Sequence, residues 1–492
     1  MRNLAMCTIG ARIKRALIFL PACAALLLLM PLCHAQEGNF DTTFGDSGRL
    51  LVDVSVLGHS DVLQRLILLP SGKLLMSGTC EYQDAVDPEL FENTFCVTQL
   101  LPDGTYDGTF GPGGLGYIQF NRFSGWPKNT SVTDTIVLHD GRIALLGHTF
   151  GDGGVADPSF LLAVLRADGT ALDATVGGGS GYLQSQFAGK PSGGISLAQQ
   201  PDGKLLVAGV ATGVNGNDDF AVARFLANLS GLDSTFGSGG AQTVAFDLGG
   251  PGGDNSDRCA AVRLQSDGKI VMVGLSITSP AGQPASGVEI SITRLNTDGT
   301  RDLTFGTTGD GRLHYTAGQN LAGAQEAQID ASDRIVVGGA GATATGATTA
   351  QWIIDRLSKD GGRDATFNQG NPQALSIAPG NGGAVERIAL TNDGIFAIGE
   401  TPRTSGGTTN YAAIVRFKAD GSLDSKFGNG GKSYFSFTST EDFNTSARAV
   451  AVSKSGLIVA GTQTQNVPEG YDVDKFAVGR LQYDQIFSYG FE

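Results

Sequence analysis

A five-residue segment written seven times is the feature that most constrains what this chain can fold into. Its full form, Asp-x-Thr-Phe-Gly, occupies Asp41–Gly45, Asp107–Gly111, Asp233–Gly237 and Asp302–Gly306, and altered copies occupy Asp173–Gly177, Asp364–Asn368 and Asp424–Gly428. The fifth positions of these copies (45, 111, 177, 237, 306, 368 and 428) lie 60 to 69 residues apart. A period of this length indicates a repeat architecture. Any fold for this chain must therefore stack copies of one unit.

Each period contains four β-rich runs separated by turns. Glycine supplies 72 of the 492 residues and proline only 17, which indicates many tight turns between short strands and not disorder. In one period the runs are 242–246, 259–264, 270–274 and 290–295. The last of these is apolar on both alternating faces, so neighbouring sheets must cover it on both sides.

Seven units of four strands predict an all-β fold, a seven-bladed β-propeller of four-stranded antiparallel blades. The main alternative is a linear β-solenoid, whose coils are usually shorter, about 20–30 residues, and which needs distinct caps. We expect the propeller to span 36–484, with repeats at 36–102, 103–167, 168–227, 228–297, 298–359, 360–419 and 420–484, followed by a tail at 485–492.

Residues 1–35 have the character of a cleaved signal peptide. Four basic and no acidic residues open the chain, 16–32 is apolar, and we place cleavage after Ala35. The alternatives are a retained membrane anchor, for which the apolar stretch is short, and a lipid anchor through Cys33, which lacks a small preceding residue. We expect an exported, periplasmic or extracellular protein with no membrane span after cleavage.

The mature chain is strongly acidic. Without the leader, 34 − 4 = 30 basic residues face 48 acidic ones, a net charge near −18. Nucleic acids and anionic membranes require a positive footprint, so this charge argues against both as partners. We expect a monomer whose partner is an unknown protein or glycan.

The fourth run of most units contains an arginine that needs a partner, because an uncompensated buried charge costs several kcal/mol. We predict that each arginine binds the aspartate of the following repeated segment in bidentate geometry. The predicted structural pairs are Arg224–Asp233, Arg294–Asp302, Arg356–Asp364 and Arg416–Asp424, and ring closure could add Arg480–Asp41. Gln99 and Val164 replace the arginine in the first two units, which must manage otherwise.

An Asp-Gly turn joins the second and third runs, as at Asp140-Gly141, Asp202-Gly203, Asp267-Gly268 and Asp393-Gly394. Asp-Gly tolerates positive φ at both central positions of a type I′ turn, so we expect a tight two-residue hairpin. The basic residue that follows this turn is missing in the last two copies, where we expect the turn length to be unchanged.

Three cysteines remain in the mature chain. Cys80 and Cys96 flank one loop between two predicted strands, where a disulfide can form in an oxidising compartment. Cys259 is left as a small buried residue.

The sequence contains no recognisable catalytic or cofactor motif. It has no Gly-x-Ser-x-Gly elbow, His-Glu-x-x-His or phosphate-binding loop, and its histidines are too scattered for a metal site. We assign no catalytic, cofactor-binding or metal-binding residue. Calcium is the cofactor left open, because several carboxylates in variable loops could bind it, with ordinary solvated carboxylates as the alternative. These are Asp152, Asp157, Asp218, Asp219, Asp254, Asp257, Glu441, Asp442, Asp472 and Asp474.

The repeat resembles the bacterial delta-60 repeat family, whose units read Asp-Gly-Ser-Leu-Asp-x-Thr-Phe-Gly and, later, Asp-Gly-Lys-Ile-Leu-Val-x-Gly. Residues 420–428 and 202–209 are close matches, and the resemblance covers nearly the whole mature chain. It implies a β-propeller and no catalytic residues. The last nine residues are similar to a Gly-Phe-Glu ending of other exported bacterial proteins, which suggests a sorting or docking tail or a frayed terminus.

The connections between the third and fourth runs vary in length and content, as recognition loops on a rigid scaffold do. Tyr82, Tyr411 and Tyr471 there, together with Trp126 from a connection between the first and second runs, are the candidates for stacking on a ligand. We expect a non-catalytic binding or surface-interaction module that uses this variable-loop face. The alternatives are an extracellular carboxylate-dependent hydrolase or lyase acting in the central channel, which a charged cluster at the channel mouth would favour, and a purely structural envelope protein.

Overall fold

A computed structural model of the protein describes twelve stretches of the chain between Glu37 and Tyr483. They are 37–55, 59–83, 91–150, 159–213, 216–279, 287–319, 321–342, 350–377, 382–404, 409–438, 444–466 and 472–483. The chain divides into two compact units, 1–35 and 36–492, and all described residues belong to the second. The predicted signal peptide and the tail at 485–492 lie outside the described residues and stay predictions.

The described residues form antiparallel sheets and four short 3₁₀ turns (Pro112–Gly114, Phe120–Arg122, Gly177–Gly179 and Asn368–Gly370). Five sheets have four strands each. Three of them are β2–β5 (Asp61–Leu68, Leu74–Gln83, Phe91–Leu100, Tyr117–Gln119), β6–β9 (Thr130–Val137, Ile143–Thr149, Phe160–Leu165, Tyr182–Ser185) and β10–β13 (Ser192–Gln199, Leu205–Thr212, Asp218–Phe225, Ala241–Val244). The other two are β22–β25 (Val385–Leu390, Gly394–Pro402, Asn410–Lys418, Lys432–Phe435) and β26–β28 (Thr445–Ser453, Gly456–Asn466, Asp472–Leu481) with β1 (Arg49–Val52). The sixth has eight strands, β14–β17 (Asp257–Leu264, Ile270–Ile277, Val288–Leu295, Arg312–Tyr315) and β18–β21 (Leu321–Ile329, Ile335–Ala342, Gln351–Leu357, Gln373–Leu375).

The prediction of seven separate four-stranded blades was therefore wrong. Five sheets are four-stranded, and the remaining strands join into one eight-stranded sheet. The join is a single parallel pair, Val288 of β16 with Leu321 of β18, whereas every other strand pair of that sheet is antiparallel. The sequence repeat specifies the antiparallel pairs within a unit but contains no signal for a contact between units.

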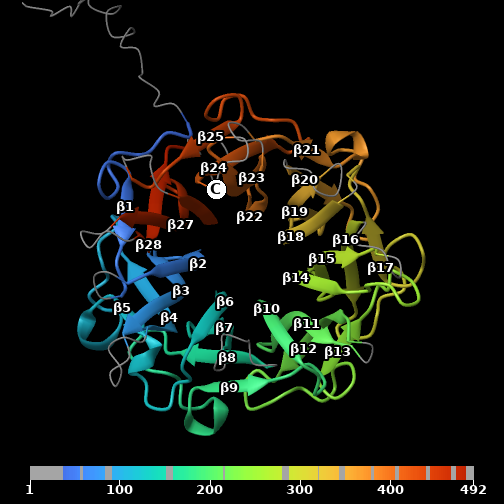
Figure 1. The fold of residues 1–492 in the computed structure, drawn as a ribbon, viewed down its shortest axis with the longest axis horizontal. Coiled ribbons are helices and arrows are strands. Elements are labelled where there is room, and N and C mark those ends of the chain that lie inside the picture. Colours follow the sequence, from blue (N-terminus) through green and yellow to red (C-terminus); the bar gives the residue numbers. More distant parts are fainter. Residues whose placement is uncertain are drawn as a thin grey trace, which may run out of the picture. The chain divides into compact units, whose positions relative to one another are not determined.

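The sheets are arranged as a propeller around a common axis (Figure 1). The innermost strands are β2, β6, β10, β14, β18, β22 and β26, each the second strand of a sequence period. They contact one another in this order, and β26 contacts β2. The ring closes by strand exchange, because β1 from the start of the described chain pairs with β28 from its end, Arg49 opposite Gly479. The first strand of each sequence period thus becomes the outermost strand of the preceding sheet.

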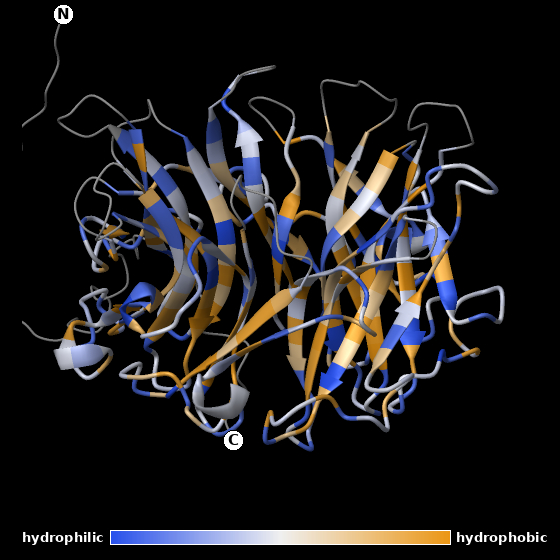
Figure 2. Ribbon diagram, turned by 60° about the horizontal axis from the view of Figure 1, so that its bottom comes forward, coloured by the Kyte–Doolittle hydropathy of each residue, from blue (hydrophilic) through white to orange (hydrophobic). Residues whose placement is uncertain are grey.

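Apolar residues fill the spaces between sheets, and Figure 2 shows them concentrated in the strands. The third strand of each sheet is buried on both faces, as in β8, where all residues of Phe160–Leu165 are buried. The phenylalanines of the repeated segment pack here too, and Phe44, Phe236 and Phe305 are completely buried. The apolar fourth run of the sequence period is therefore this third strand of the sheet, covered on both sides.

Every inner strand carries a β-bulge at an equivalent position, for example between Leu63 and Arg65 of β2 and between Ala324 and Glu326 of β18. A glycine of the second strand stands opposite each bulge. A Cβ on Gly78 would lie 2.1 Å from the Val62 carbonyl oxygen, and one on Gly339 would lie 2.0 Å from that of Gly323. The bulge therefore requires glycine there, which explains the glycine that follows each apolar run of the second strand.

The predicted type I′ hairpins were wrong. In the first unit five residues separate the paired Leu68 and Leu74, with Gly72 N–H bonded to the Leu69 carbonyl and Leu69 N–H to the Lys73 carbonyl. Only the glycine has positive φ, as at Gly141 and Gly203, so the turn is a three-residue loop with a glycine bulge. The expected constant length was also wrong, since four residues separate Leu390 from Ile395.

Cys80 of β3 and Cys96 of β4 form a disulfide, with their Cα atoms 5.8 Å apart. Both cysteines are completely buried, and Cys259 is the free, buried cysteine of the described residues. The bond ties together the two strands that lead into the first variable loop.

We predict that replacing both Cys80 and Cys96 by alanine lowers the free energy of unfolding by about 3 kcal/mol, because a disulfide that closes a loop of this length restricts the unfolded chain. Urea unfolding with and without dithiothreitol measures the change. As a control, addition of dithiothreitol should not change the stability of the double variant. Equal stability of both proteins under oxidising conditions would contradict the prediction.

Candidate functional site

All five predicted arginines lie within ion-pair distance of the predicted aspartates. The distances between nitrogen and carboxylate oxygen are 2.9 Å for Arg224–Asp233, 2.7 Å for Arg294–Asp302, 2.7 Å for Arg356–Asp364, 2.9 Å for Arg416–Asp424 and 2.7 Å for Arg480–Asp41. The arginine side chains are almost fully buried, from 1% exposed for Arg294 to 10% for Arg480. The last pair joins the two ends of the described chain.

The geometry is not bidentate, because the carboxylate is shared. Arg294 Nε donates to one oxygen of Asp302, while Thr304 donates to the other through its N–H and its hydroxyl. Lys269, the residue after the Asp-Gly turn, lies 2.7 Å from the same oxygen as Arg294. The threonine, lysine and arginine together keep the pKa of Asp302 well below its usual range, against the effect of burial.

The guanidinium also connects neighbouring units of the repeat. Arg294 Nη1 donates to the Lys359 carbonyl at 2.6 Å, and Arg356 Nη1 donates to the Ala419 carbonyl at 2.8 Å, each carbonyl belonging to the next unit. The ring of Phe305 lies 5.0 Å from the Arg294 guanidinium carbon. Arg294 thus contacts the aspartate of the repeated turn, the ring of a phenylalanine and a backbone carbonyl group of the next unit.

The first two units use a different cation. Gln99 donates to Asp107, and Lys73 supplies the charge at 2.6 Å, whereas Arg142 pairs with Asp173 at 2.5 Å. Arg416 departs in another way, because Lys426 replaces the threonine and the guanidinium turns to Asp393 at 2.7 Å. The aspartate is therefore present in every unit, whereas the residue that supplies the positive charge differs between units.

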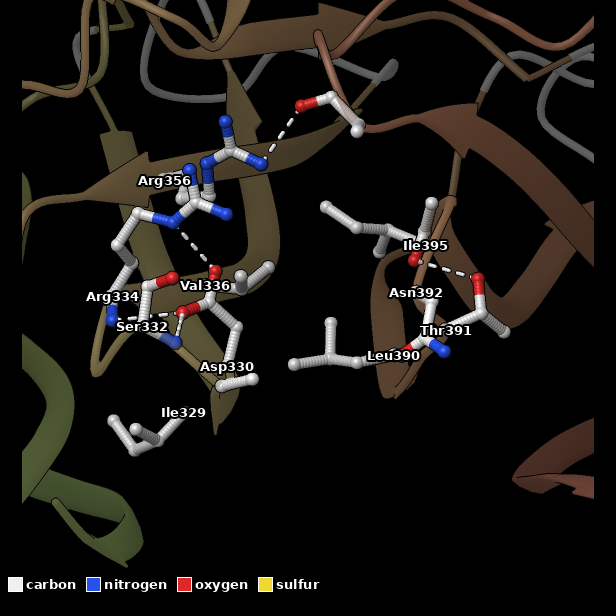
Figure 3. Close-up of a pocket in the computed structure, with 13 residues that line it drawn as sticks. Ile329, Asp330, Ser332, Arg334, Val336, Arg356, Leu390, Thr391, Asn392 and Ile395 are labelled. Carbon is white, nitrogen blue, oxygen red and sulfur yellow. Dashed lines mark hydrogen bonds and ion pairs between the residues drawn. The ribbon is translucent and has the colours of Figure 1, made fainter. Parts of the chain in front are cut away.

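Two of the cavities on the turn face lie beside the short turns of the last two units. One of about 310 Å³ separates the turn at 329–334 from the turn at 390–395, with Arg334 and Arg356 on one wall and Leu390 and Asn392 on the other (Figure 3). A larger one of about 830 Å³ lies beyond the 390–393 turn, toward Leu68, Val452 and Tyr483. In the first cavity Arg356 is already bonded to Asp364 and Ala419, so its guanidinium holds the fold together.

A cluster of five charged side chains occupies the axis of the ring. Arg65 Nε lies 2.5 Å from Asp134, and its Nη1 reaches Glu326 at 3.8 Å. Arg387 approaches Glu326 at 3.6 Å, and Arg263 donates a hydrogen bond to it. The two carboxylates are 3% and 1% exposed. Since β2 and β18 are not neighbours in the ring, the Arg65–Glu326 contact crosses the axis.

A second charged group lies directly beside this cluster, toward the variable-loop end of the strands. Glu386 and Arg448 are the bulged residues of the adjacent inner strands β22 and β26 and form an ion pair at 3.0 Å. Glu400 of β23 is hydrogen-bonded to Asn410. Burial raises the pKa of Glu400, the positive charge of Arg448 lowers this pKa in part, and the negative charge of Glu386 raises it further. Glu386 is thus paired with a cation, whereas burial raises the pKa of Glu400 above its ordinary value.

Buried aspartates hold the loops that enter two inner strands. Asp61 accepts hydrogen bonds from the N–H groups of Val54 and Ser55, and Asp257 accepts one from Phe246. Burial raises the pKa of each to about 6. Lys475 lies 3.8 Å from Asp61, whereas Asp257 has the charges of Asp219 and Asp247 nearby.

The aromatic residues expected to stack on a ligand are engaged within the fold. Trp126 packs against Phe95 and Phe120 and is 9% exposed. The Tyr82 hydroxyl donates to Glu92, and Arg403 lies over the ring of Tyr411, while Tyr471 lies outside the described residues.

The described residues contain no group of three or more His, Cys, Asp or Glu side chains that could hold a metal ion. Asp152, Asp157, Glu441 and Asp442 lie outside the described residues, so calcium binding stays a prediction. No helix in the described part of the chain is long and apolar enough to cross a membrane.

The fold and its repeats define a β-propeller. Three segments, 200–236, 265–305 and 392–427, match a family model described as a β-propeller domain of unknown function, DUF5122. Each segment contains one copy of the repeated Asp-x-Thr-Phe segment or its altered form. The match supports a β-propeller family, and the finer resemblance to delta-60 repeats stays a prediction. No curated protein matches the chain.

Several solved structures resemble the fold at low identity. A polysaccharide lyase, Uly1, is 10% identical with a TM-score of 0.46, covering 91% of this chain and 93% of its own. A GH43_1 enzyme from Xanthomonas citri is 12% identical with a TM-score of 0.32, covering 77% and 93%. A subtype N11 neuraminidase-like protein of A/flat-faced bat/Peru/033/2010 (H18N11) is 9% identical with a TM-score of 0.35, covering 90% and 97%. At these scores nothing about the site is transferred from them.

We predict that Arg294→Met lowers the free energy of unfolding by about 3–5 kcal/mol, because it removes one member of a buried ion pair. Chemical unfolding measures the loss. Arg301→Met is the matched control, since Arg301 lies exposed a few residues away and should change stability by less than about 0.5 kcal/mol. Similar losses in both variants would contradict the assigned role of the buried pair.

We predict that Asp257→Asn stabilises the protein at pH 7 and not at pH 4. Burial raises the pKa of Asp257 to about 6 in the folded state, while in the unfolded chain the carboxyl has its ordinary pKa of 3.8. Folding stability therefore falls as the pH rises through this window, by at most about 3 kcal/mol for this group. Thermal unfolding between pH 4 and 7 measures the difference, with exposed Asp254→Asn as control. A variant that loses stability at pH 7 would refute this account.

Proposed function

We propose that the protein is an exported glycoside hydrolase that uses a carboxylate pair beside the axis of its propeller. The observation that carries the proposal is the arrangement of Glu386, Glu400 and Arg448. Hydrolysis of a glycosidic bond uses two carboxyl groups, one that donates a proton to the leaving oxygen and one that acts as base or nucleophile. Two carboxyl groups whose surroundings differ in this way are suited to the two roles.

Glu400 is the proposed general acid. It is partly buried, its pKa is raised, and the Asn410 side chain fixes its orientation. Glu386 is the proposed base or nucleophile, and Arg448 holds it in an ion pair at 3.0 Å. Arg448 is a positioning residue for Glu386.

The surroundings of the pair suit a neutral or mildly acidic glycan. Charged side chains gather at the axis, where Arg65 contacts Asp134 and Glu326. A binding module without chemistry would be favoured by small and apolar side chains at this place. Action on a glycan outside the cytoplasm, as a monomer and without a required cofactor, completes the proposal.

We predict that Glu400→Gln and Glu386→Gln each lower the rate of glycan hydrolysis at least about 100-fold, because each removes a proton-transfer or nucleophilic group. Release of reducing ends from arabinan, xylan and polygalacturonate measures the rate. The wild-type rate should fall as the pH rises through the raised pKa of Glu400, because the acid form is consumed.

The matched control is Glu289→Gln. Glu289 pairs with His314 within the eight-stranded sheet, which does not contain Glu386 or Glu400, and its replacement should leave the rate unchanged. Unchanged melting temperatures must accompany any loss of rate. Absence of released ends from all three glycans by the wild-type protein would overturn the proposal, and binding of a glycan without hydrolysis would instead establish a binding module.

A further inference from the structure

The cavity of about 830 Å³ on the turn face lies where the described chain ends. Its walls come from turns of the first, sixth and seventh units and from Tyr483, the last described residue. A volume of this size is ordinary for a binding site, since such sites measure about 300–1,000 Å³. The apolar part of the wall includes Leu68, Leu69, Pro70, Leu390, Val452 and Ile458.

Two shortened turns border this cavity. Four residues separate the paired Leu390 and Ile395 in the sixth unit, and four separate the paired Val452 and Leu457 in the seventh. The equivalent turns of the other five units contain five residues. The repeat is therefore shortened in the two units that, together with the first, surround the end of the described chain.

Tyr483 is held on the wall of the cavity by contacts within the sixth unit. Its ring lies 5.0 Å from the ring of Phe396 and 4.7 Å from the guanidinium carbon of Arg416, and Arg416 donates to its hydroxyl at 3.2 Å. The segment 484–492 therefore starts from a fixed point on this wall. Nine extended residues span at most about 30 Å, which is long enough to cross a cavity of this volume.

We propose that this cavity binds the segment 484–492 of the same chain. Transfer of large apolar and aromatic side chains from water to apolar walls favours binding. Attachment through Tyr483 makes the binding intramolecular, which raises the effective concentration of the segment at the cavity. Glu400 lies near the other end of β23 from this cavity, so docking is independent of the proposed hydrolysis. The large side chains of the segment are Ile486, Phe487, Tyr489 and Phe491.

A tryptophan placed in this segment of the full chain tests the proposal. Trp126 and Trp352 are 9% and 0% exposed, so acrylamide quenching of fluorescence reports mainly on the new side chain. We expect the quenching constant of the Phe487→Trp protein to be at least about threefold lower than that of a free peptide of 484–492 with the same substitution, because close packing excludes the quencher. A constant equal to that of the peptide would overturn the proposal.

Substitutions in the cavity wall test where the tryptophan is shielded. Adding Val452→Asp should raise the quenching constant to the peptide value, because burying a carboxylate against apolar side chains is unfavourable. Ser455→Arg, at an exposed position of the wall, should do the same and gives the readout if Val452→Asp does not fold. Leu303→Asp is the matched control, since Leu303 is 59% exposed on another unit, and should leave the constant unchanged.

Two further outcomes would overturn the assignment. Shielding that survives both wall substitutions would place the segment against another surface. Shielding that is lost on dilution of the protein would place the segment in the cavity of a second copy of the chain.

Discussion

The structure depends on a cation held between one unit and the next, which in five of the units is a buried guanidinium. Taking such a charge out of water costs several kcal/mol, and that cost is offset only if every donor finds an acceptor. Arg294 meets this condition with Asp302, with the Lys359 carbonyl of the adjacent unit and with the face of Phe305. The aspartate, threonine and phenylalanine therefore repeat together because they form one binding site for one cation.

This dependence explains how the ring tolerates departures from the repeat. In the first units Lys73 and Arg142 bring the positive charge from the neighbouring turn, and the aspartate remains in place. At the junction of the two chain ends, Arg480 and Asp41 are provided by opposite ends of the described chain, and β1 completes the sheet of β28. Ring closure thus uses the same ion pair as every other junction of this type.

The sequence made these pairs predictable because each arginine and its aspartate are eight or nine residues apart. The hairpin geometry was not predictable from Asp-Gly alone, since a two-residue and a three-residue loop both accept glycine with positive φ. The parallel pair Val288–Leu321 and the bulge opposite Gly78 arise from packing between units and strands. The axial cluster was missed for the same reason, because Arg65 and Glu326 are 261 positions apart and meet only when the ring closes.

The axis is where the repeat loses its symmetry, and this bears on function. The residue after the bulge is the same position in every unit, yet it is filled by Arg65, Asp134, Ser196, Ala261, Glu326, Arg387 and Ala449. Small residues at three of these positions leave room for the long side chains at the others. Apolar side chains of similar volume would fill the same space without the cost of desolvating charges. The charged residues at the axis next to Glu386 therefore support the proposed function, because the fold alone would be served as well by apolar side chains.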